Sequence, residues 1–248
     1  MVGYPVYSHR GNHHETMNPY KITQAIPDDH PIVIALQNSD EDKVKLHLDA
    51  GVSPYAPGLI AGALASGKEG IVQAFLDHDL DPSLPFNMHG ETPIFRSIST
   101  RHRNIKILEL LLKKGASVHQ DTTGSSTPLH TASAEWPDAI PFLLQAGADV
   151  NAASTIGRTP LMSAAHRNQI QSLELLLAAG AGLEDRDNEG TTPLILAARA
   201  GSFEAVEWLL NHGADIQAKD NRGKSATDWA QENGHTEIAN LLRSRIDS

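Results

Sequence analysis

Apolar residues along this chain follow two helical patterns that alternate with each other. The stretch PLILAARA, beginning at Pro193, is rich in small apolar residues, and Phe203, Val206, Leu209 and Leu210 follow after a short break. The spacing of the second group places four apolar side chains on one face of a helix. The pattern therefore predicts a short helix of small side chains followed by a longer amphipathic helix.

The same pair of helices returns at a fixed period. Thr-Pro followed by an apolar residue begins at Thr92, Thr127, Thr159 and Thr192, a degenerate copy begins at Ser225, and successive starts lie 35, 32, 33 and 33 residues apart. A threonine hydroxyl can cap a helix, and proline suits the first helical position because no N–H is needed there. One such unit cannot bury its own apolar face, so the units are expected to stack on one another.

A second marker, the dipeptide Gly-Ala, keeps the same phase as the first. It occurs at Gly115, Gly147, Gly180 and Gly213. Glycine is expected to end the amphipathic helix there, because a left-handed residue is needed at that point. The turn-forming residues that follow, as in ADIQAKDNRG, predict a finger-like turn that leaves the stack.

The sequence TPLHTA at residues 127–132, followed by GAD at 147–149, closely resembles the ankyrin repeat. The resemblance implies an all-α, ankyrin-repeat solenoid of about seven stacked helix-turn-helix units with β-turn or hairpin fingers. The repeats are expected at about 30–57, 58–89, 90–124, 125–156, 157–189, 190–222 and 223–248. Residues 1–29 are expected to form an N-terminal extension that is partly mobile.

The second unit departs from the common pattern. It has Asp79 where the terminal glycine belongs, and only 28 residues separate Gly51 from Asp79. The finger near Tyr55, Ala56 and Pro57 is therefore expected to be shortened. The last unit is expected to close the stack as a cap without a finger.

Composition narrows the functions that such a stack could serve. Thirty acidic residues against twenty basic ones give a net charge of -10, which disfavours general binding to nucleic acid. The absence of cysteine excludes thiolate chemistry and fits a reducing compartment. The sequence has neither an apolar run long enough to span a membrane nor the apolar region of a signal peptide. We expect a protein of the cytoplasm, or of the nucleus, that binds neither nucleic acid nor membrane.

His130 tests whether the repeats carry acid–base chemistry. The equivalent position holds Phe95, Met162, Ile195 and Asp228 in the other units, and these residues share no such chemistry. The resemblance to ankyrin repeats implies that a histidine here hydrogen-bonds within the turn and helps to fix adjacent units. We therefore interpret His130 as structural.

The three tryptophans are interpreted as packing residues. Trp136, followed by Pro137, predicts a rebuilt connection between two helices, and a solvent-facing interaction anchor is the alternative. Trp208 lies in an apolar run and is expected in the core. Trp229 is expected to pack within the closing unit.

No group of residues in the sequence has the signature of a catalytic or metal site. His9, His13 and His14 are close together, but Gly11 and Asn12 interrupt them, so a polar tail is preferred over a metal site. HExxH, P-loop, GxGxxG and Ser-His-Asp patterns are all missing. We expect no catalytic residue, no metal and no cofactor, and therefore no enzyme.

The resemblance also implies a partner-binding surface on the concave side of the stack. Its contact positions lie beside the glycine of each finger turn and late in each inner helix. In the fingers these positions hold Met88, His89, Glu91, Ile156, Arg158, Glu189, Thr191, Arg222 and Lys224. In the inner helices they hold Arg96, Ser99, Thr131, Ala134, Ser163, His166, Leu196 and Arg199. Apolar residues among polar and charged ones are what a protein interface requires.

Two charged segments leave a further alternative open. The third unit is locally basic, and LEDRDNEG at 183–190 is acidic. The basic residues are Arg101, Arg103, Lys106, Lys113 and Lys114. Solvated helix and finger surfaces explain both segments, and docking of a charge-complementary partner is the alternative.

The leading hypothesis is a non-enzymatic scaffold or adaptor that binds a protein partner through the concave surface. The alternative is an unusual enzyme or small-molecule-binding protein with a pocket near the N-terminal repeats, where His89 and His102 would act. The chain is expected to be a monomer or to self-associate weakly, through the concave face or an end repeat, and the end repeat that contains HPIVIALQ is the preferred contact.

Overall fold

The computed structural model describes residues 26–56, 58–87, 90–119 and 126–246. Within these ranges the regular elements are helices, and the pairing between extended residues is limited to one isolated bridge between Lys219 and Ser225. The chain divides into two compact units, Met1–Ser117 and Val118–Ser248.

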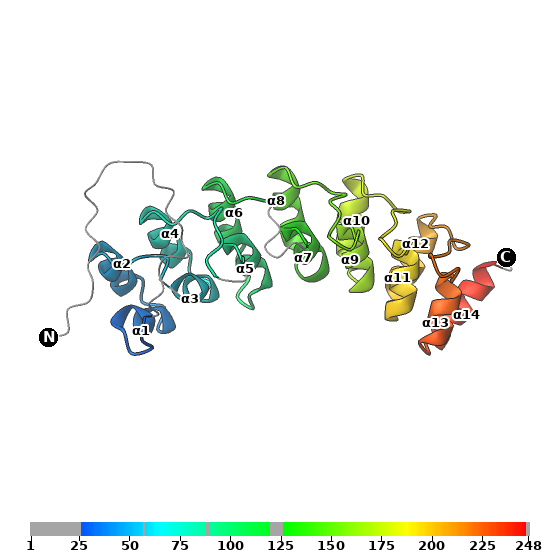
Figure 1. Ribbon diagram of the computed structural model, residues 1–248, viewed down its shortest axis with the longest axis horizontal. Coiled ribbons are helices and arrows are strands. Elements are labelled where there is room, and N and C mark those ends of the chain that lie inside the picture. The colour runs from blue at the N-terminus through cyan, green and yellow to red at the C-terminus, as the bar shows by residue number, and fades with distance from the viewer. Residues whose placement is uncertain (1–25, 57, 88–89, 120–125, 247–248) are drawn as a thin grey trace. The chain divides into compact units, whose positions relative to one another are not determined.

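The first unit contains three pairs of helices (Figure 1). In chain order they are α1 (Pro31–Gln37), α2 (Glu41–Asp49), α3 (Leu59–Ala65), α4 (Glu69–Asp77), α5 (Pro93–Ser99) and α6 (Ile105–Lys113). The first helices of the pairs, α1, α3 and α5, contact one another in sequence and form an inner layer. The second helices, α2, α4 and α6, do the same in an outer layer.

The second unit contains four pairs of helices, arranged in the same two layers. Its helices are α7 (Pro128–Glu135), α8 (Ile140–Gln145), α9 (Pro160–His166), α10 (Ile170–Ala178), α11 (Pro193–Ala200), α12 (Phe203–Asn211), α13 (Ala226–Glu232) and α14 (Thr236–Ile246), with a short 3-10 turn, η2, at Pro137–Ala139. The inner helices α7, α9, α11 and α13 pack each on the next, and so do the outer helices (Figure 1). The predicted all-α stack of helix pairs is confirmed within each unit.

The core of each unit lies between its two layers of helices. Ile71, Phe75 and Leu108 are fully buried in the first unit, and Leu161 and Leu209 are fully buried in the second. The predicted small side chains of the inner helices are buried as well, including Ala164, Ala165, Ala197 and Ala198. Because an alanine side chain is short, neighbouring inner helices can approach closely.

The predicted threonine caps form in some repeats and not in others. The hydroxyls of Thr159 and Thr192 accept the N–H of the residue three positions later, at 3.4 and 3.3 Å, and Ser225 does the same at 3.2 Å. Thr92 differs, because its buried hydroxyl finds no hydrogen-bond partner among the described residues. The predicted side-chain cap is therefore confirmed at Thr159, Thr192 and Ser225, and it is wrong at Thr92.

The outer helices from α2 to α12 are each followed by a residue in the left-handed conformation that the sequence predicts for glycine. The four glycines of the Gly-Ala marker have φ between 87° and 93°. Asp79 occupies the corresponding position after α4 and also has a positive φ, of 64°. An L residue pays a steric cost there that glycine avoids.

The connection between the first two helix pairs is short, as predicted. Residues 50–58 join α2 to α3, whereas residues 146–159 and 179–192 make the corresponding connections in the second unit. The Tyr55 hydroxyl bonds to the backbone after the next outer helix, donating to the Asp79 carbonyl at 3.2 Å and accepting the Asp81 N–H at 2.7 Å. Pro57 lies outside the described residues.

The tryptophans agree with the predictions in two of three cases. Trp136 is buried, with 8% of its surface exposed, beside the rebuilt turn η2, so the alternative of a solvent-facing anchor is wrong. Trp229 is buried to the same degree, which confirms its packing role. Trp208 is only half-buried and stacks on His212 with ring centroids 3.7 Å apart. Its assignment to the core is wrong because it lies on the partly solvated side of α12.

Candidate functional site

The finger turns at residues 154–158, 187–191 and 220–224 share one hydrogen-bonding pattern. In each, the backbone N–H of the first residue donates to the carbonyl four positions later, and its side-chain oxygen accepts the N–H of that same residue. The two distances are 2.8 and 3.1 Å for Ser154 and Arg158, 3.1 and 2.9 Å for Asp187 and Thr191, and 3.0 and 2.9 Å for Asp220 and Lys224. The turns therefore hold their tips in a fixed backbone geometry.

Asparagine residues join each finger to the preceding one. The Asn188 N–H donates to the Ile156 carbonyl at 3.0 Å, and the Asn221 N–H donates to the Glu189 carbonyl at 2.9 Å. Both side-chain amides add a second bond to the preceding finger, at 3.1 and 3.2 Å. Residues 154–158, 187–191 and 220–224 consequently form one continuous backbone edge.

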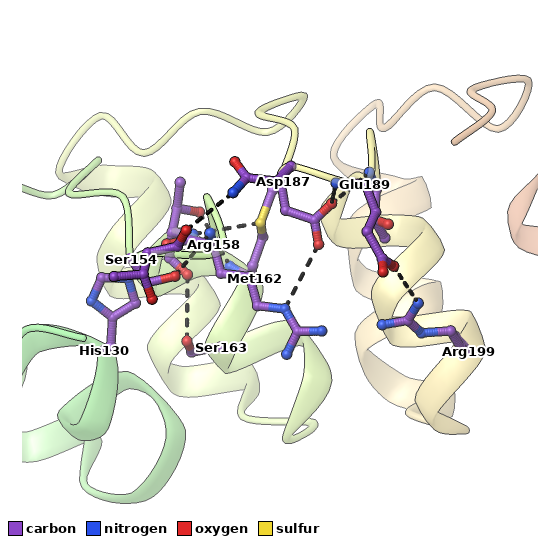
Figure 2. A network of polar contacts seen from close by, with 12 residues as sticks. His130, Ser154, Arg158, Met162, Ser163, Asp187, Glu189 and Arg199 are labelled. Atoms are coloured by element: carbon purple, nitrogen blue, oxygen red, sulfur yellow. Dashed lines mark hydrogen bonds and ion pairs between the residues drawn. The ribbon is translucent and has the colours of Figure 1, made fainter. Parts of the chain in front are cut away.

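His130 connects an inner helix to the finger that follows it. Its Nδ1 accepts the Thr127 N–H at 3.1 Å, and its Nε2 lies 2.8 Å from the Arg158 carbonyl. Because one nitrogen accepts and the other must donate, the ring is a neutral imidazole. The structural interpretation of His130 is confirmed, and the residue fixes the finger that carries Arg158 (Figure 2).

Most of the predicted contact residues of the second unit are accessible to solvent. Ile156 is 52% exposed, and Thr191 and Leu196 are both 0% exposed. The prediction is wrong for Thr191 and Leu196. The Thr191 side chain is short and stays buried, whereas the longer side chains of Arg158 and Lys224 at the same finger position reach solvent. Leu196 is apolar and is buried in the core. We call the accessible set the finger surface, and its members are Thr131, Ala134, Ile156, Arg158, Ser163, His166, Glu189, Arg199, Arg222 and Lys224.

Three cations of the finger surface converge on the ring of Trp229. The Arg199 and Arg222 guanidinium carbons lie 5.3 and 5.7 Å from the ring centroid, and the Lys224 ammonium nitrogen lies 4.4 Å from it. These distances are in the range of cation–π attraction. The indole N–H of Trp229 donates to Asp220 Oδ2 at 2.8 Å, which fixes the ring on the finger turn.

Carboxylates neutralise part of this positive charge. Glu189 lies 3.4 Å from Arg199 Nη1 and 3.8 Å from Arg222 Nη2, so one exposed carboxylate is shared by two guanidinium groups. Lys224 forms an ion pair with Glu232. Figure 2 shows the Glu189 carboxylate directed toward Arg199.

A second charged group lies one repeat earlier on the finger surface. The Nε of Arg158 is 3.7 Å from the buried carboxylate of Asp187 (Figure 2). This Nε is itself buried and finds no hydrogen-bond partner within the part of the chain that the structure describes. Desolvation lowers the pKa of His166, and the positive charges of Arg158, Arg167 and Arg199 lower it further.

The first unit has a smaller version of the same arrangement. Glu91 and Arg96, both half-buried, lie 3.6 Å apart across a finger and an inner helix. Ser99 is exposed, but its hydroxyl donates to the Phe95 carbonyl at 3.0 Å. Met88 and His89 lie outside the described residues.

Of the two residues named for the alternative, a catalytic or ligand-binding pocket, His102 lies in an open hollow and His89 is outside the described residues. His102 lines a hollow of about 460 Å³ together with Lys68, Arg103 and Asn104. The hydroxyl of Ser66 at its edge is used in donating to the Ala63 carbonyl at 2.6 Å. This geometry offers no enclosed chamber with convergent polar groups, which is the usual form of a small-molecule site.

The described ranges also bear on metal binding and on membrane insertion. Those ranges contain no group of three or more His, Cys, Asp or Glu side chains placed to hold a metal ion. His9, His13 and His14 lie outside the described residues. None of the described helices is both long and apolar enough to cross a bilayer.

The sequence did not reveal the role of Trp229 in assembling the cations. It indicated that the ring packs, and separately that Arg199, Arg222 and Lys224 face a partner. The available signal was the placement of Arg222 and Lys224 shortly before Trp229 in the closing repeat. The third cation comes from the preceding repeat, so its contribution depends on how the repeats stack.

Comparisons with known proteins give a consistent result. A family model described as ankyrin repeats, in three copies, matches residues 32–154, 107–187 and 172–248. The chain is 30% identical over 105 residues to a putative ankyrin repeat protein of fowlpox virus, a match that covers 42% of this chain and 17% of that protein.

Two further relatives match shorter segments. Protein phosphatase 1 regulatory subunit 27 of Mus musculus is 40% identical over 58 residues, which cover 23% of this chain and 38% of that protein. Dynein axonemal heavy chain 12 of Bos taurus is 40% identical over 68 residues, which cover 27% of this chain and 19% of that protein. The chain thus spans well under half the length of each of these relatives.

Proposed function

Because the chain belongs to the ankyrin-repeat family, we propose that it is a non-enzymatic adaptor that binds a protein partner through its finger surface. Ankyrin repeats generally mediate contacts between proteins. The finer claim, which assigns this role to particular residues of the second unit, depends on the geometry of the fingers.

The observation that carries the proposal is that different residues of a finger have different roles: some hold the backbone and others face solvent. Asp187 and Asn188 form the turn and bind the preceding finger, and Asp220 and Asn221 do the same one repeat later. Glu189 and Arg222, which directly follow these asparagines, are exposed, and the Glu189 carboxylate forms ion pairs with Arg199 and Arg222 instead of bonding to the turn. A rigid backbone edge that carries varied, accessible side chains is a suitable frame for a binding site.

The chemistry of the finger surface favours a protein as the partner. It combines an exposed aliphatic residue, Ile156, with arginines, and arginine is enriched in protein interfaces. The net charge of -10 disfavours nucleic acid, and the lack of cysteine fits the cytoplasm or nucleus. The hollow at His102 is open, which gives the enzymatic alternative little support.

One relative supports a role in a protein complex. Its name states that it is a regulatory subunit of protein phosphatase 1. The similarity supports a protein-binding role for this chain and does not identify its partner.

The test is affinity purification from the native cell followed by binding measurements with two double variants. Ile156→Glu replaces an exposed aliphatic side chain with a charge, and Arg199→Glu reverses a positive charge. Together they are expected to weaken binding at least about tenfold. Ile246→Glu with Arg243→Glu makes the same changes on the exposed face of α14 and serves as the matched control. Equal binding by the two double variants would overturn the proposed surface.

Self-association through the first repeat is a second candidate role. Ile34 on α1 and Leu46 on α2 are 44% and 63% exposed, so the first pair of helices presents two large aliphatic side chains to solvent. Sedimentation equilibrium of the native chain and of Leu46→Glu tests this role. A monomeric mass for the native chain at high concentration would remove it.

A further inference from the structure

The two arginines above Trp229 have hydrogen-bonding capacity that the described part of the chain does not use. A guanidinium group carries five N–H donors. The Arg199 guanidinium makes its contact with Glu189 at 3.4 Å, and that of Arg222 approaches Glu189 only to 3.8 Å. Charge-assisted bonds to a carboxylate are normally 2.7–2.9 Å long. Both groups are therefore held near a carboxylate without being saturated by it.

The position of these groups is fixed before any ligand arrives. Both guanidinium groups lie over the Trp229 ring, and Trp229 is itself held by its hydrogen bond to Asp220. The Asn233 side chain also donates to the Arg199 carbonyl at 2.7 Å. An ordered pair of donors loses less entropy on binding than two freely rotating side chains.

Glu189 indicates which chemical group fits between the arginines. It is a carboxylate, its side chain is 54% exposed, and those of Arg199 and Arg222 are 23% and 60% exposed. An exposed ion pair of this kind contributes little to the free energy of folding. Glu189 can therefore be displaced by another carboxylate with better geometry.

We propose that the pair Arg199 and Arg222 binds a carboxylate side chain from an acidic segment of the partner protein, in competition with Glu189. This inference rests on the proposed protein-binding function and specifies the chemistry of one part of the finger surface. Lys224, 4.4 Å from the centre of the Trp229 ring, adds positive charge at the edge of the site.

The other charges around Trp229 favour a carboxylate over a phosphate. Asp220 is buried and accepts the indole N–H at the edge of the ring, Glu232 pairs with Lys224, and Asp228 accepts bonds from Ser225. These negative groups repel a dianion more strongly than a single carboxylate. A phosphorylated segment is therefore expected to bind more weakly than a glutamate-rich one.

The experiment is a titration of the full chain with a short glutamate-rich peptide, followed through the NMR signal of the Trp229 indole N–H. The matching peptide with glutamine at every glutamate position is the charge control. Arg222→Gln is expected to weaken binding about tenfold, as loss of a hydrogen bond to a charged group does. Glu189→Gln is expected to strengthen it about threefold, because the internal competitor is removed. Arg243→Gln, on the exposed face of α14, is the matched control and is expected to leave affinity unchanged.

Each outcome separates this inference from the proposed function. Equal binding of the glutamate and glutamine peptides, equal effects of Arg222→Gln and Arg243→Gln, or no gain from Glu189→Gln would overturn the carboxylate site. So would tighter binding of a phosphoserine peptide than of the glutamate peptide. If the peptide tests fail but the double variant Ile156→Glu with Arg199→Glu still abolishes binding of the native partner, the protein-binding function is supported and the proposed carboxylate site is wrong.

Discussion

Single residues in this protein hold the binding surface in place through bonds that differ from repeat to repeat. Ser154, Asp187 and Asp220 occupy the same position in successive fingers and all bond the backbone of their own turn. Asp220 has an additional task, because its second oxygen accepts the indole N–H of Trp229 at 2.8 Å. The same position therefore supports the fold in three repeats and the candidate site in one.

Replacement of Asp220 is expected to destabilise the closing repeats through the loss of two separable contributions, the turn bonds and the bond to the Trp229 indole. Asp220→Ala removes the turn bonds and the indole bond, with an expected loss of about 1–3 kcal/mol. Asp220→Ser should lose less, because the serine at position 154 accepts the N–H four positions later, as Asp220 does from Lys224. Urea unfolding of both variants measures the two contributions. An equal loss would contradict a stabilising role for the turn bond that serine keeps, and an unchanged stability of Asp220→Ser would contradict a separate role for the bond to Trp229.

Asp220 also predicts how stability depends on acidity. Burial opposes ionisation, but the N–H groups of Lys224, Trp229 and Arg222 outweigh it and hold the pKa of Asp220 below its usual range. A lowered folded pKa stabilises the protein above the unfolded pKa, and this contribution is lost as pH falls through the folded value. Unfolding midpoints of the native chain should fall in acid more steeply than those of Asp220→Asn. Parallel acid profiles would show that Asp220 is not responsible.

His78 predicts the opposite dependence in the first unit. Its Nδ1 lies 2.7 Å from the Ala74 carbonyl and its Nε2 lies 2.8 Å from Asp49 Oδ1, so two acceptors face one ring. Burial lowers the pKa of His78, but these bonds and the charges of Asp49 and Asp77 outweigh burial and raise it. The stabilisation is complete below the unfolded pKa and is lost as pH rises through the raised folded value.

An NMR titration of the His78 ring measures this directly. Asp49→Asn is expected to lower the pKa of His78, and His78→Gln is expected to remove the decline in stability of the first unit on the alkaline side. An unchanged His78 titration in Asp49→Asn would exclude the carboxylate as the cause.

Among the structural elements, the fingers depend on glycine at two kinds of position. Gly190 and Gly223 both have φ of 75°, which disfavours an L side chain. A Cβ at Gly190 would also lie 2.4 Å from Asn221 Oδ1, whereas a Cβ at Gly223 would meet no atom within 4 Å. A comparison of alanine substitutions at the two positions therefore separates the cost of backbone strain from the cost of a clash between neighbouring fingers.

Gly223→Ala is expected to cost about 1 kcal/mol through strain alone. Gly190→Ala should cost more, because Asn221 must move and its bonds to the preceding finger weaken. Urea unfolding of Gly190→Ala with and without Asn221→Ala gives the coupling between the two residues. Equal losses for the two glycine variants, with no coupling to Asn221, would argue against the continuous edge of fingers.

The helices were predictable from the sequence because their signals are local. Proline after Thr159, the glycine at 180 and the apolar spacing of residues 203–210 each act within a few positions of the chain. Contacts between repeats were not predictable in the same way. The bond from His130 to the Arg158 carbonyl and the contact of Arg199 with Trp229 join residues about thirty positions apart, and they depend on the stacking.

The candidate surface was predictable by position but not by exposure. Arg158, Thr191 and Lys224 occupy the same place in successive fingers, yet Thr191 is fully buried and the other two are accessible. Leu196 occupies the place that Ser163 holds in the preceding repeat, and its apolar side chain is buried. The repeat pattern locates a position on the stack, while side-chain length and polarity decide whether it reaches a partner.

For the molecule as a whole, net charge and local charge have opposite signs. The chain carries a net charge of -10, whereas Arg158, Arg199, Arg222 and Lys224 all lie on the finger surface. At physiological salt, charges more than about 8 Å apart are largely screened, so local groups dominate close contacts. The finger surface can therefore attract an acidic segment on a protein that is acidic overall.

This charge balance predicts that double-stranded DNA does not compete with the partner. DNA binding needs many cations placed along a phosphate backbone, and here each cation is near Glu189, Asp187 or Glu232. Fluorescence anisotropy of labelled DNA at physiological salt is expected to show no binding at micromolar chain concentrations. Saturable binding in that range would mean that the finger surface recognises phosphate.

The most direct test of the account is hydrogen–deuterium exchange of the chain, free and bound to its purified protein partner. The account predicts slower exchange on binding in residues 154–158, 187–191 and 220–224, with little change in the outer helices α8, α10 and α12. Protection confined to the outer helices, with the fingers unchanged, would contradict it.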